Sequence, residues 1–359
     1  MEFQVGETRS GYEFLDVLKR SKNGIEFRVK NTLAGRIEAL RTMPEGSQSD
    51  PQQAERFLRE MRVHAGLVHP NIVTLFNALE LRNQLVITTE LVEGPTVADK
   101  LTLGPIPWPD AVAIARQVLA GAAYAHRHGI VHRNIAPENI IIGTGGIVKL
   151  ANFALAKGAG SPRLTQVGVP IGNLKYISPE QIKAIGDVDS RSDLYSLGMV
   201  LYEMICGRPA FVMASEFELM AAQVGSPPVS PHQVNPKVPE ELGTVLLKAL
   251  AKNPAERYQT AAEFDEALVK VTVGEMVRTA PSAPKPAAST PVDGSAAAHA
   301  ANPEEIPRTG VFQPPPSSPV PAFLAAPRTP LLSRQQMIII GAAGACTGLL
   351  LTVLWVFVR

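Results

Sequence analysis

The sequence predicts a large α+β core, followed by a disordered linker and one C-terminal transmembrane helix. Its 359 residues exceed one average domain, which leaves room for appendages around the core. Residues 85–94 read Leu-Val-Ile-Thr-Thr-Glu-Leu-Val-Glu-Gly and are typical of a buried strand. Residues 49–60 begin with a cap, Asp50, and with Pro51 at the first helical position, which favours a helix.

Composition excludes two kinds of function. The formal net charge is only +1, which gives no electrostatic case for nucleic acid as a partner. Cys206 and Cys346 lie far apart in the sequence and lack metal-ligand spacing. We expect two unpaired thiols in a reducing compartment, with no disulfide framework and no metal centre.

The stretch 279–333 is predicted to be a disordered linker. It is rich in Pro, Ala and Ser and poor in large apolar residues. A flexible coil of this length reaches roughly 40 Å on average, and its prolines extend it further. The core is therefore expected to move near its anchor.

That anchor is predicted at residues 337–358, an apolar run without charge. As a helix the run measures roughly 33 Å, which matches the hydrocarbon thickness of a bilayer. A buried core helix is the alternative, but a run this long after such a linker favours a membrane span. Gly344 and Gly348 lie on one helical face, where they would permit a homodimer contact or occur by chance.

The expected location is the cell (inner) membrane, single-pass, with the core in the cytoplasm. Residues 1–10 contain glutamates and no apolar run after a basic stretch, so they do not form a secretory signal peptide. Arg328 and Arg334 before the span slightly outweigh Arg359 after it, which supports the same orientation.

Two short segments carry a family resemblance. Residues 132–139 read His-Arg-Asn-Ile-Ala-Pro-Glu-Asn, and residues 152–154 read Asn-Phe-Ala. They resemble the catalytic loop and the metal loop of protein kinases, with each aspartate replaced by asparagine. From 12 to 271 the chain resembles a bacterial serine/threonine protein kinase. The resemblance implies a two-lobed fold, with a small β-rich lobe at about 12–90 and a large helical lobe at about 91–271.

The scaffold positions of that family are retained. Glu60 stands where the family pairs a helix glutamate with a strand lysine, and Thr89 and Glu90 stand at the gatekeeper and the hinge. In the family the position of Glu180 pairs with that of Arg257. The resemblance implies structural roles for a set of residues in the large lobe: His132, Arg133, Phe153, Glu180, Asp193 and Arg257.

The positions of phosphoryl-transfer chemistry are degenerate. Asn134 replaces the catalytic base, and its amide does not accept a proton near neutral pH. Ala136 replaces a lysine that steadies the phosphate. Asn152 replaces a metal-binding carboxylate and leaves Asn139 as the one matched metal ligand, although magnesium prefers anionic oxygen. No intact catalytic residue is therefore expected.

The nucleotide lobe departs from the family as well. Residues 38–41 read Glu-Ala-Leu-Arg, so Arg41 stands in place of the lysine that faces Glu60. Gly24 is the one glycine kept in the Gly-rich loop, and Glu26 places a carboxylate over the adenine position. Lys19 would be either a phosphate contact or a solvated lysine. The resemblance implies these nucleotide-binding candidates: Gly24, Ala39, Arg41, Glu60, Thr89, Glu90, Asn139 and Asn152.

These substitutions predict a membrane-anchored pseudokinase that binds a cytoplasmic signalling protein, with an active kinase as one candidate partner. One alternative is a weak or unusual ATP-dependent kinase that uses Arg41, Asn139 and a displaced acid such as Glu138. Another is a nucleotide-sensing module without turnover. ATP therefore stays open as a ligand, and Mg²⁺ is expected to bind weakly or not at all.

Overall fold

The computed structural model describes residues 3–21, 24–43, 57–58, 61–81, 84–153, 156, 173–183 and 188–279. All of them belong to the first of two units of the chain, 1–285. Glu60, the linker beyond Thr279, the expected span 337–358 and its two glycines lie outside the described residues. Within the described part of the chain, no helix is both long and apolar enough to cross a bilayer.

The small lobe is a six-stranded antiparallel sheet in the order β1-β2-β3-β4-β6-β5. Alternating apolar residues turn one face of the sheet inward, where Phe14 and Phe27 meet edge to face at 5.2 Å and Phe3 stacks on Phe14. The strands are β1 (Thr8–Arg9), β2 (Tyr12–Ser21), β3 (Gly24–Asn31), β4 (Arg36–Thr42), β5 (Leu75–Leu81) and β6 (Gln84–Glu90).

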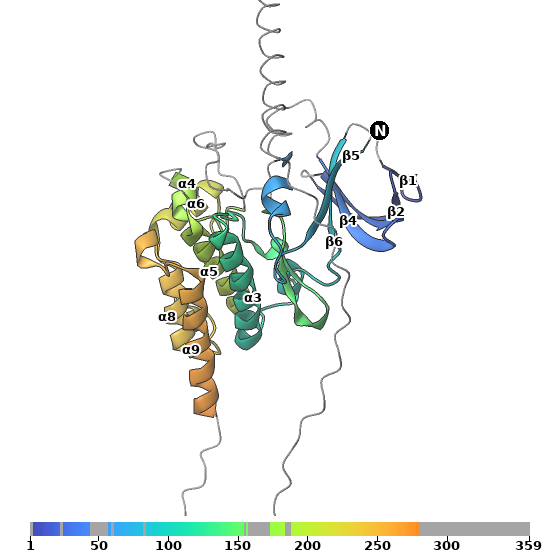
Figure 1. Cartoon of the computed structure of the whole chain (residues 1–359). Coiled ribbons are helices and arrows are strands. Elements are labelled where there is room, and N and C mark those ends of the chain that lie inside the picture. Colours follow the sequence, from blue (N-terminus) through green and yellow to red (C-terminus); the bar gives the residue numbers. More distant parts are fainter. Residues whose placement is uncertain are drawn as a thin grey trace, which may run out of the picture. The chain divides into compact units, whose positions relative to one another are not determined.

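The large lobe is helical and carries one two-stranded hairpin. Figure 1 shows its helices on one side of the domain and the six-stranded sheet on the other. The helices are α2 (Val97–Leu101), α3 (Trp108–Arg127), α4 (Pro179–Lys183), α5 (Ser190–Cys206), α6 (Glu216–Gly225), α7 (Pro231–Val234), α8 (Glu240–Ala249) and α9 (Ala261–Thr279). The hairpin strands are β7 (Ile140–Ile142) and β8 (Val148–Leu150).

Helix α5 is the centre of the large lobe. It is buried on nearly all sides because its sequence is apolar around the whole circumference. Asp189 caps its first turn by accepting a hydrogen bond from the Arg191 amide, and Gly207 ends it in the left-handed conformation.

The six-stranded sheet and the helical lobe together confirm the predicted two-lobed α+β fold for the described residues.

The lobes are joined through strand β8. The backbone amide of Val73 donates to the Leu150 carbonyl, and the Leu150 amide donates to the Asn71 carbonyl. The Lys149 ammonium lies 2.7 Å from the Glu90 carboxylate at the end of β6. The small-lobe turn at residues 69–73 is thus fastened to the hairpin beneath the cleft.

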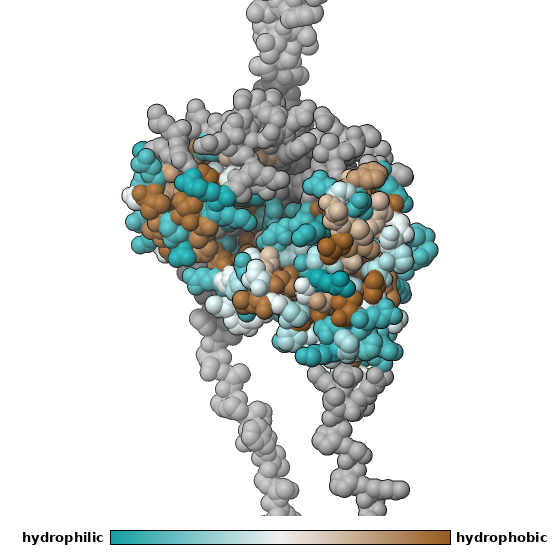
Figure 2. Space-filling view, turned by 180° about the vertical axis from the view of Figure 1, so that it is seen from behind, coloured by the Kyte–Doolittle hydropathy of each residue, from teal (hydrophilic) through white to brown (hydrophobic). Residues whose placement is uncertain are grey.

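One boundary differs from the sequence expectation. Strand β6 ends at Glu90, whereas the predicted buried strand continued to residue 94. Helix α9 extends to Thr279, because no proline interrupts the sequence before Pro281. Figure 2, seen from behind, shows hydrophobic and hydrophilic surface interspersed over the domain.

Candidate functional site

A cavity of about 530 Å³ lies between the two lobes. Strands β2 to β4 and β6 line it from the small lobe, and the hairpin and the loop after it line it from the large lobe. The nucleotide-binding candidates that line it are Gly24, Ala39, Arg41, Thr89, Glu90, Asn139 and Asn152. Asn134 and Ala136 do not line it, and Ala136 is buried in the large-lobe core.

The roof of the cavity is a row of alternating charges. Glu26 on β3 is directly opposite Lys19 on β2 and Arg41 on β4. Side chains directly opposite in neighbouring strands share a face and lie about 5 Å apart at their Cβ atoms. One row further along, Arg28 pairs with Asp16 at 3.6 Å. The roof therefore carries its own counter-charges.

The Gly24 backbone fixes the start of this roof. Its φ is +110°, and a Cβ built on it would lie 2.1 Å from the Thr42 carbonyl oxygen. No other residue type fits this place without a backbone shift. In this structure Gly24 thus allows the backbones of β3 and β4 to approach each other closely.

Asp193 organises the catalytic-loop segment from below. Its buried carboxylate accepts hydrogen bonds from the amides of His132 and Arg133 and contacts His126 Nε2 at 2.7 Å. Burial alone would raise the pKa of Asp193, but the hydrogen bond and charge of His126 and the contacts of His132 hold it below its ordinary value. Arg133 keeps a φ of +65°, which this network maintains.

Three rings in contact connect the large lobe to the small lobe. The centroid of the Phe153 ring lies 4.6 Å from that of His132, in an edge-on contact, and 5.1 Å from that of His64. Burial lowers the pKa of His132, and its Nδ1 accepts from the Asn134 amide while Nε2 meets the Ala151 carbonyl. His132 is therefore neutral and acts in positioning.

Two asparagines face each other where the family binds metal. The Asn152 amide nitrogen donates to Asn139 Oδ1 at 3.1 Å, and Asn139 Nδ2 donates to the Asn134 carbonyl at 2.8 Å. Asn152 keeps a φ of +67°, a conformation that asparagine tolerates. Its Oδ1 is buried and has no hydrogen-bond partner among the residues that the structure describes.

This pair does not fit a magnesium ion. Magnesium requires octahedral oxygen ligands and is usually bound through carboxylates. Here both groups are neutral, and the oxygen of Asn139 already accepts the hydrogen bond from Asn152. The two asparagines supply no negative charge to offset the cost of removing water from the ion.

The carboxylate of Glu138 does reach the edge of the cavity, but it already accepts a hydrogen bond from a neighbouring side chain. Glu138 lines the cavity, and its Oε1 accepts a hydrogen bond from the Asn173 side chain at 3.1 Å. Gln181 contacts the catalytic loop by donating to the Arg133 carbonyl at 3.0 Å.

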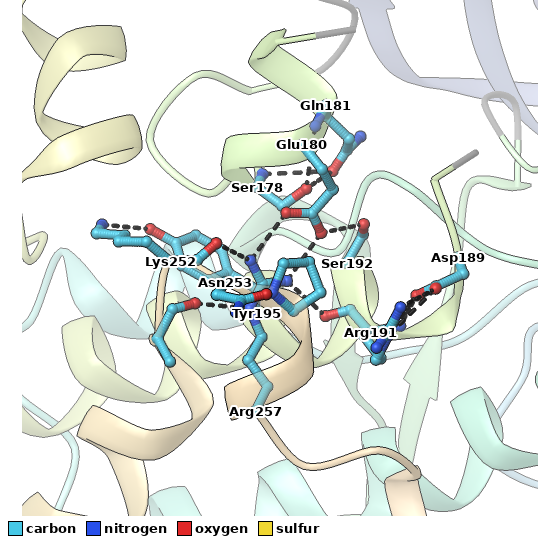
Figure 3. A network of polar contacts seen from close by, with 12 residues as sticks. Ser178, Glu180, Gln181, Asp189, Arg191, Ser192, Tyr195, Lys252, Asn253 and Arg257 are labelled. Carbon is cyan, nitrogen blue, oxygen red and sulfur yellow. Dashed lines mark hydrogen bonds and ion pairs between the residues drawn. The ribbon is translucent and has the colours of Figure 1, made fainter. Parts of the chain in front are cut away.

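The polar network of Figure 3 holds the large lobe beneath the cavity. Arg257 is buried and binds Glu180 with two parallel hydrogen bonds of 2.8 Å each. Burial alone would raise the pKa of Glu180, but the hydrogen bond and charge of Arg257 and the Ser192 hydroxyl lower it. The pairing that the family resemblance implies is present.

Glu90 at the hinge is held by contacts with both lobes. Glu90 Oε1 accepts from the Thr74 amide at 2.6 Å and from Lys149 at 2.7 Å, while Thr89 lines the cavity. Sequence reasoning did not single out Lys149, His64 or Gln181. His64 follows Glu60 by four residues in the sequence, a spacing that would place both on one face of a helix, and this was the available signal.

Comparison with known proteins agrees with this geometry. The protein kinase domain model matches residues 12–268. The chain is 40% identical over 243 residues to the serine/threonine-protein kinase PknB of Mycobacterium leprae, covering 66% of this chain and 38% of that protein. It is 32% identical over 263 residues to PrkC of Bacillus subtilis, covering 73% and 40%.

A solved structure is similar as well. The PknI kinase domain of Mycobacterium tuberculosis matches with a TM-score of 0.61 and 26% identity, over 76% of this chain and all of that one. The chain spans about 40% of the length of the curated relatives that it matches.

Proposed function

Because the chain belongs to the protein kinase domain family, we propose that it is a serine/threonine-kinase-like pseudokinase, anchored in the membrane, that binds a signalling partner instead of transferring phosphate. The observation that carries this proposal is the hydrogen bond between Asn152 and Asn139. It places two neutral amides where phosphoryl transfer needs charge on a metal. In the roof row of Lys19, Glu26 and Arg41, the Glu26 carboxylate stands at the adenine position implied by the family resemblance, where it disfavours ATP.

The retained scaffold supports a binding role. Asp193 still braces the catalytic-loop segment, and Glu180 still pairs with Arg257. Neither interaction performs phosphate chemistry, whereas both keep the large lobe in a defined shape. A defined surface is what a scaffold or an allosteric partner requires.

Phosphate transfer from labelled ATP tests the proposal directly. The full chain, an Asn139→Ala variant and an active relative such as PknB are incubated with ATP, Mg²⁺ and a general protein substrate. The native chain should transfer no more label than the variant, since Asn139 has no metal to hold. Transfer well above the variant would overturn the proposal.

A second candidate is a weak serine/threonine kinase, which the 40% identity to PknB favours. Glu138 is the nearest carboxylate on the loop, and it would need to release Asn173 to act. An Asn173→Ala variant separates the two functions. A kinase that uses Glu138 should gain activity when this contact is removed, whereas a pseudokinase should stay inactive.

A third candidate is a nucleotide-sensing module, which the open cavity of about 530 Å³ favours. It requires ligand-dependent stabilisation without transfer, a result that thermal unfolding separates from the other two functions.

Membrane anchoring through residues 337–358 is part of the proposal. The uncharged apolar run of the sequence supports it, with the kinase-like domain in the cytoplasm. Removing 337–359 should move the chain from the membrane fraction of cells to the soluble fraction. A chain that stays soluble with the run intact would contradict the anchor.

A further inference from the structure

The loop before α6 and the first turn of this helix expose large apolar side chains together with an acidic one. Val212, Met213 and Phe217 are 69%, 45% and 76% exposed. Glu216 is exposed next to Phe217 in the first turn. We call these residues, Val212, Met213, Glu216 and Phe217, the α6 patch. Exposed apolar side chains gathered in this way mark an interaction surface more often than isolated ones do.

The inner side of α6 is fixed, so this exposure is not a sign of a loose helix. Gln223 is fully buried and accepts a hydrogen bond from the Tyr195 hydroxyl. Its amide nitrogen donates to the carbonyls of Leu174 and Lys175 at 3.3 and 2.8 Å. Glu216 and Phe217 are therefore presented by an anchored helix, and Gln223 connects that helix to Leu174 and Lys175.

A second surface on the same chain has the opposite charge. The ring of Tyr124 lies between His69 and His128, at centroid distances of 5.1 and 4.4 Å, and Arg127 lies over it at 5.8 Å. We call His69, Tyr124, Arg127 and His128 the ring cluster. Val68, which precedes His69, is 70% exposed and supplies an apolar edge.

The ring cluster has an excess of positive charge. Its positive charge is the Arg127 guanidinium, for which no ion pair is present among the described residues. Burial, Arg127 and Lys149 lower the pKa of His69, which disfavours a second positive charge there. Basic residues also suit the C-terminal end of α3, whose dipole is negative. Arg127 and His128 are exposed, so the guanidinium and the His128 ring are accessible to a further contact.

We propose that the α6 patch docks onto the ring cluster of a second copy of this chain. Glu216 would face Arg127, and Phe217 would pack on the rings of Tyr124 and His128. Two copies joined through their α6 patches alone would bring like charges together, which disfavours that arrangement. The inference deepens the proposed scaffold function and rests on it, because it names a second copy as a binding partner.

Charge-reversal variants, tested alone and mixed with each other, test the contact. Donor- and acceptor-labelled full chains in detergent micelles report self-association by energy transfer. Glu216→Arg alone and Arg127→Glu alone should each weaken association about tenfold, because each places like charges opposite each other. Mixing the two variants should restore it, since the Glu216 of one chain then meets the Arg127 of the other.

Two controls keep the result specific. Lys30→Glu reverses an exposed charge elsewhere, and Leu33→Ser removes an apolar side chain that is 94% exposed, as a match for Phe217→Ser. Association that depends on the membrane span affects every variant equally and does not respond to mixing. All variants should keep the unfolding temperature of the native chain, because the altered residues are largely exposed.

The outcomes are distinct from those of the phosphate-transfer test. Weakened single variants that recover on mixing support the contact. Native chains that do not associate, or single variants that associate like Lys30→Glu, overturn it, and so do single variants that fail to recover when mixed. None of these results bears on whether the cleft transfers phosphate, which the labelled-ATP assay decides separately.

Discussion

The side-chain amide of Asn152 donates a hydrogen bond to the side-chain oxygen of Asn139 at 3.1 Å. The two residues belong to different segments, one after β8 and one before β7, and the contact closes the floor of the interlobe cavity. A carboxylate at position 152 would need a cation here. The amide instead satisfies its neighbour directly, so the loop keeps its backbone conformation without a metal.

Restoring the family residues alone should not restore activity. The triple variant Arg41→Lys, Asn134→Asp, Asn152→Asp regains the base and the metal carboxylate but keeps Glu26 in the roof. We expect its phosphate transfer to stay at the level of the native chain, because Glu26 still places a carboxylate over the adenine position, where it disfavours ATP. Adding Glu26→Val should increase transfer. High activity in the triple variant would refute this explanation.

The Glu180–Arg257 pair should be important for stability. Arg257→Met leaves a largely buried carboxylate without its partner and should lower the free energy of unfolding by about 3–5 kcal/mol. The matched control is Arg116→Met, which breaks the exposed pair with Asp265 and should cost less than about 1 kcal/mol. Urea unfolding measures both. Equal costs would show that burial of the pair is not decisive.

Acid should unfold the chain partly through Glu180. Its folded pKa lies below the ordinary value of 4.5, so its charged form favours the folded state. This contribution is complete above about pH 4.5 and is lost as the pH falls through the folded pKa. Glu180→Gln should therefore flatten the dependence of unfolding free energy on pH below 4.5. An unchanged acid slope would contradict the assignment.

His132 should give a separate dependence at higher pH. Its folded pKa lies below 6.5, so the unfolded chain binds a proton that the folded chain does not. Stability should thus rise with pH up to about 6.5, with a slope of at most about 1.4 kcal/mol per pH unit from this group. His132→Gln should reduce the slope measured from pH 5 to 7. A steeper slope in the variant would exclude this cause.

Gly24 should tolerate no side chain. Gly24→Ala places a Cβ against the Thr42 carbonyl in a left-handed conformation and should cost about 2–3 kcal/mol or more of stability. Gly35→Ala is the matched control, since Gly35 also has a positive φ but open space around it. Thermal unfolding of both variants separates steric contact from backbone strain. Similar losses would mean that strain alone accounts for Gly24.

Much of the fold could be predicted from the sequence because its signals are local. The apolar run that begins at residue 85 indicated the buried strand β6, and the retained motifs indicated two lobes. The resemblance also indicated the pairing of Glu180 with Arg257, residues far apart in the chain.

The charged roof could not be predicted in the same way. Lys19, Glu26 and Arg41 are opposite one another only through the register of three strands, which no local pattern specifies. The contact of Asn173 with Glu138 also depends on tertiary packing. Individual substitutions were visible in the sequence, but their mutual compensation became visible only in the structure.

Thermal unfolding of the full chain tests the central claim most directly. The unfolding temperature is measured with and without ATP, each with and without Mg²⁺, because a ligand that binds the folded state must stabilise it. The hydrogen bond between Asn152 and Asn139 and the charged roof predict no change in unfolding temperature under any of these conditions. A rise that requires Mg²⁺ would contradict the account and indicate a kinase, and a rise without Mg²⁺ would contradict it in favour of a nucleotide sensor.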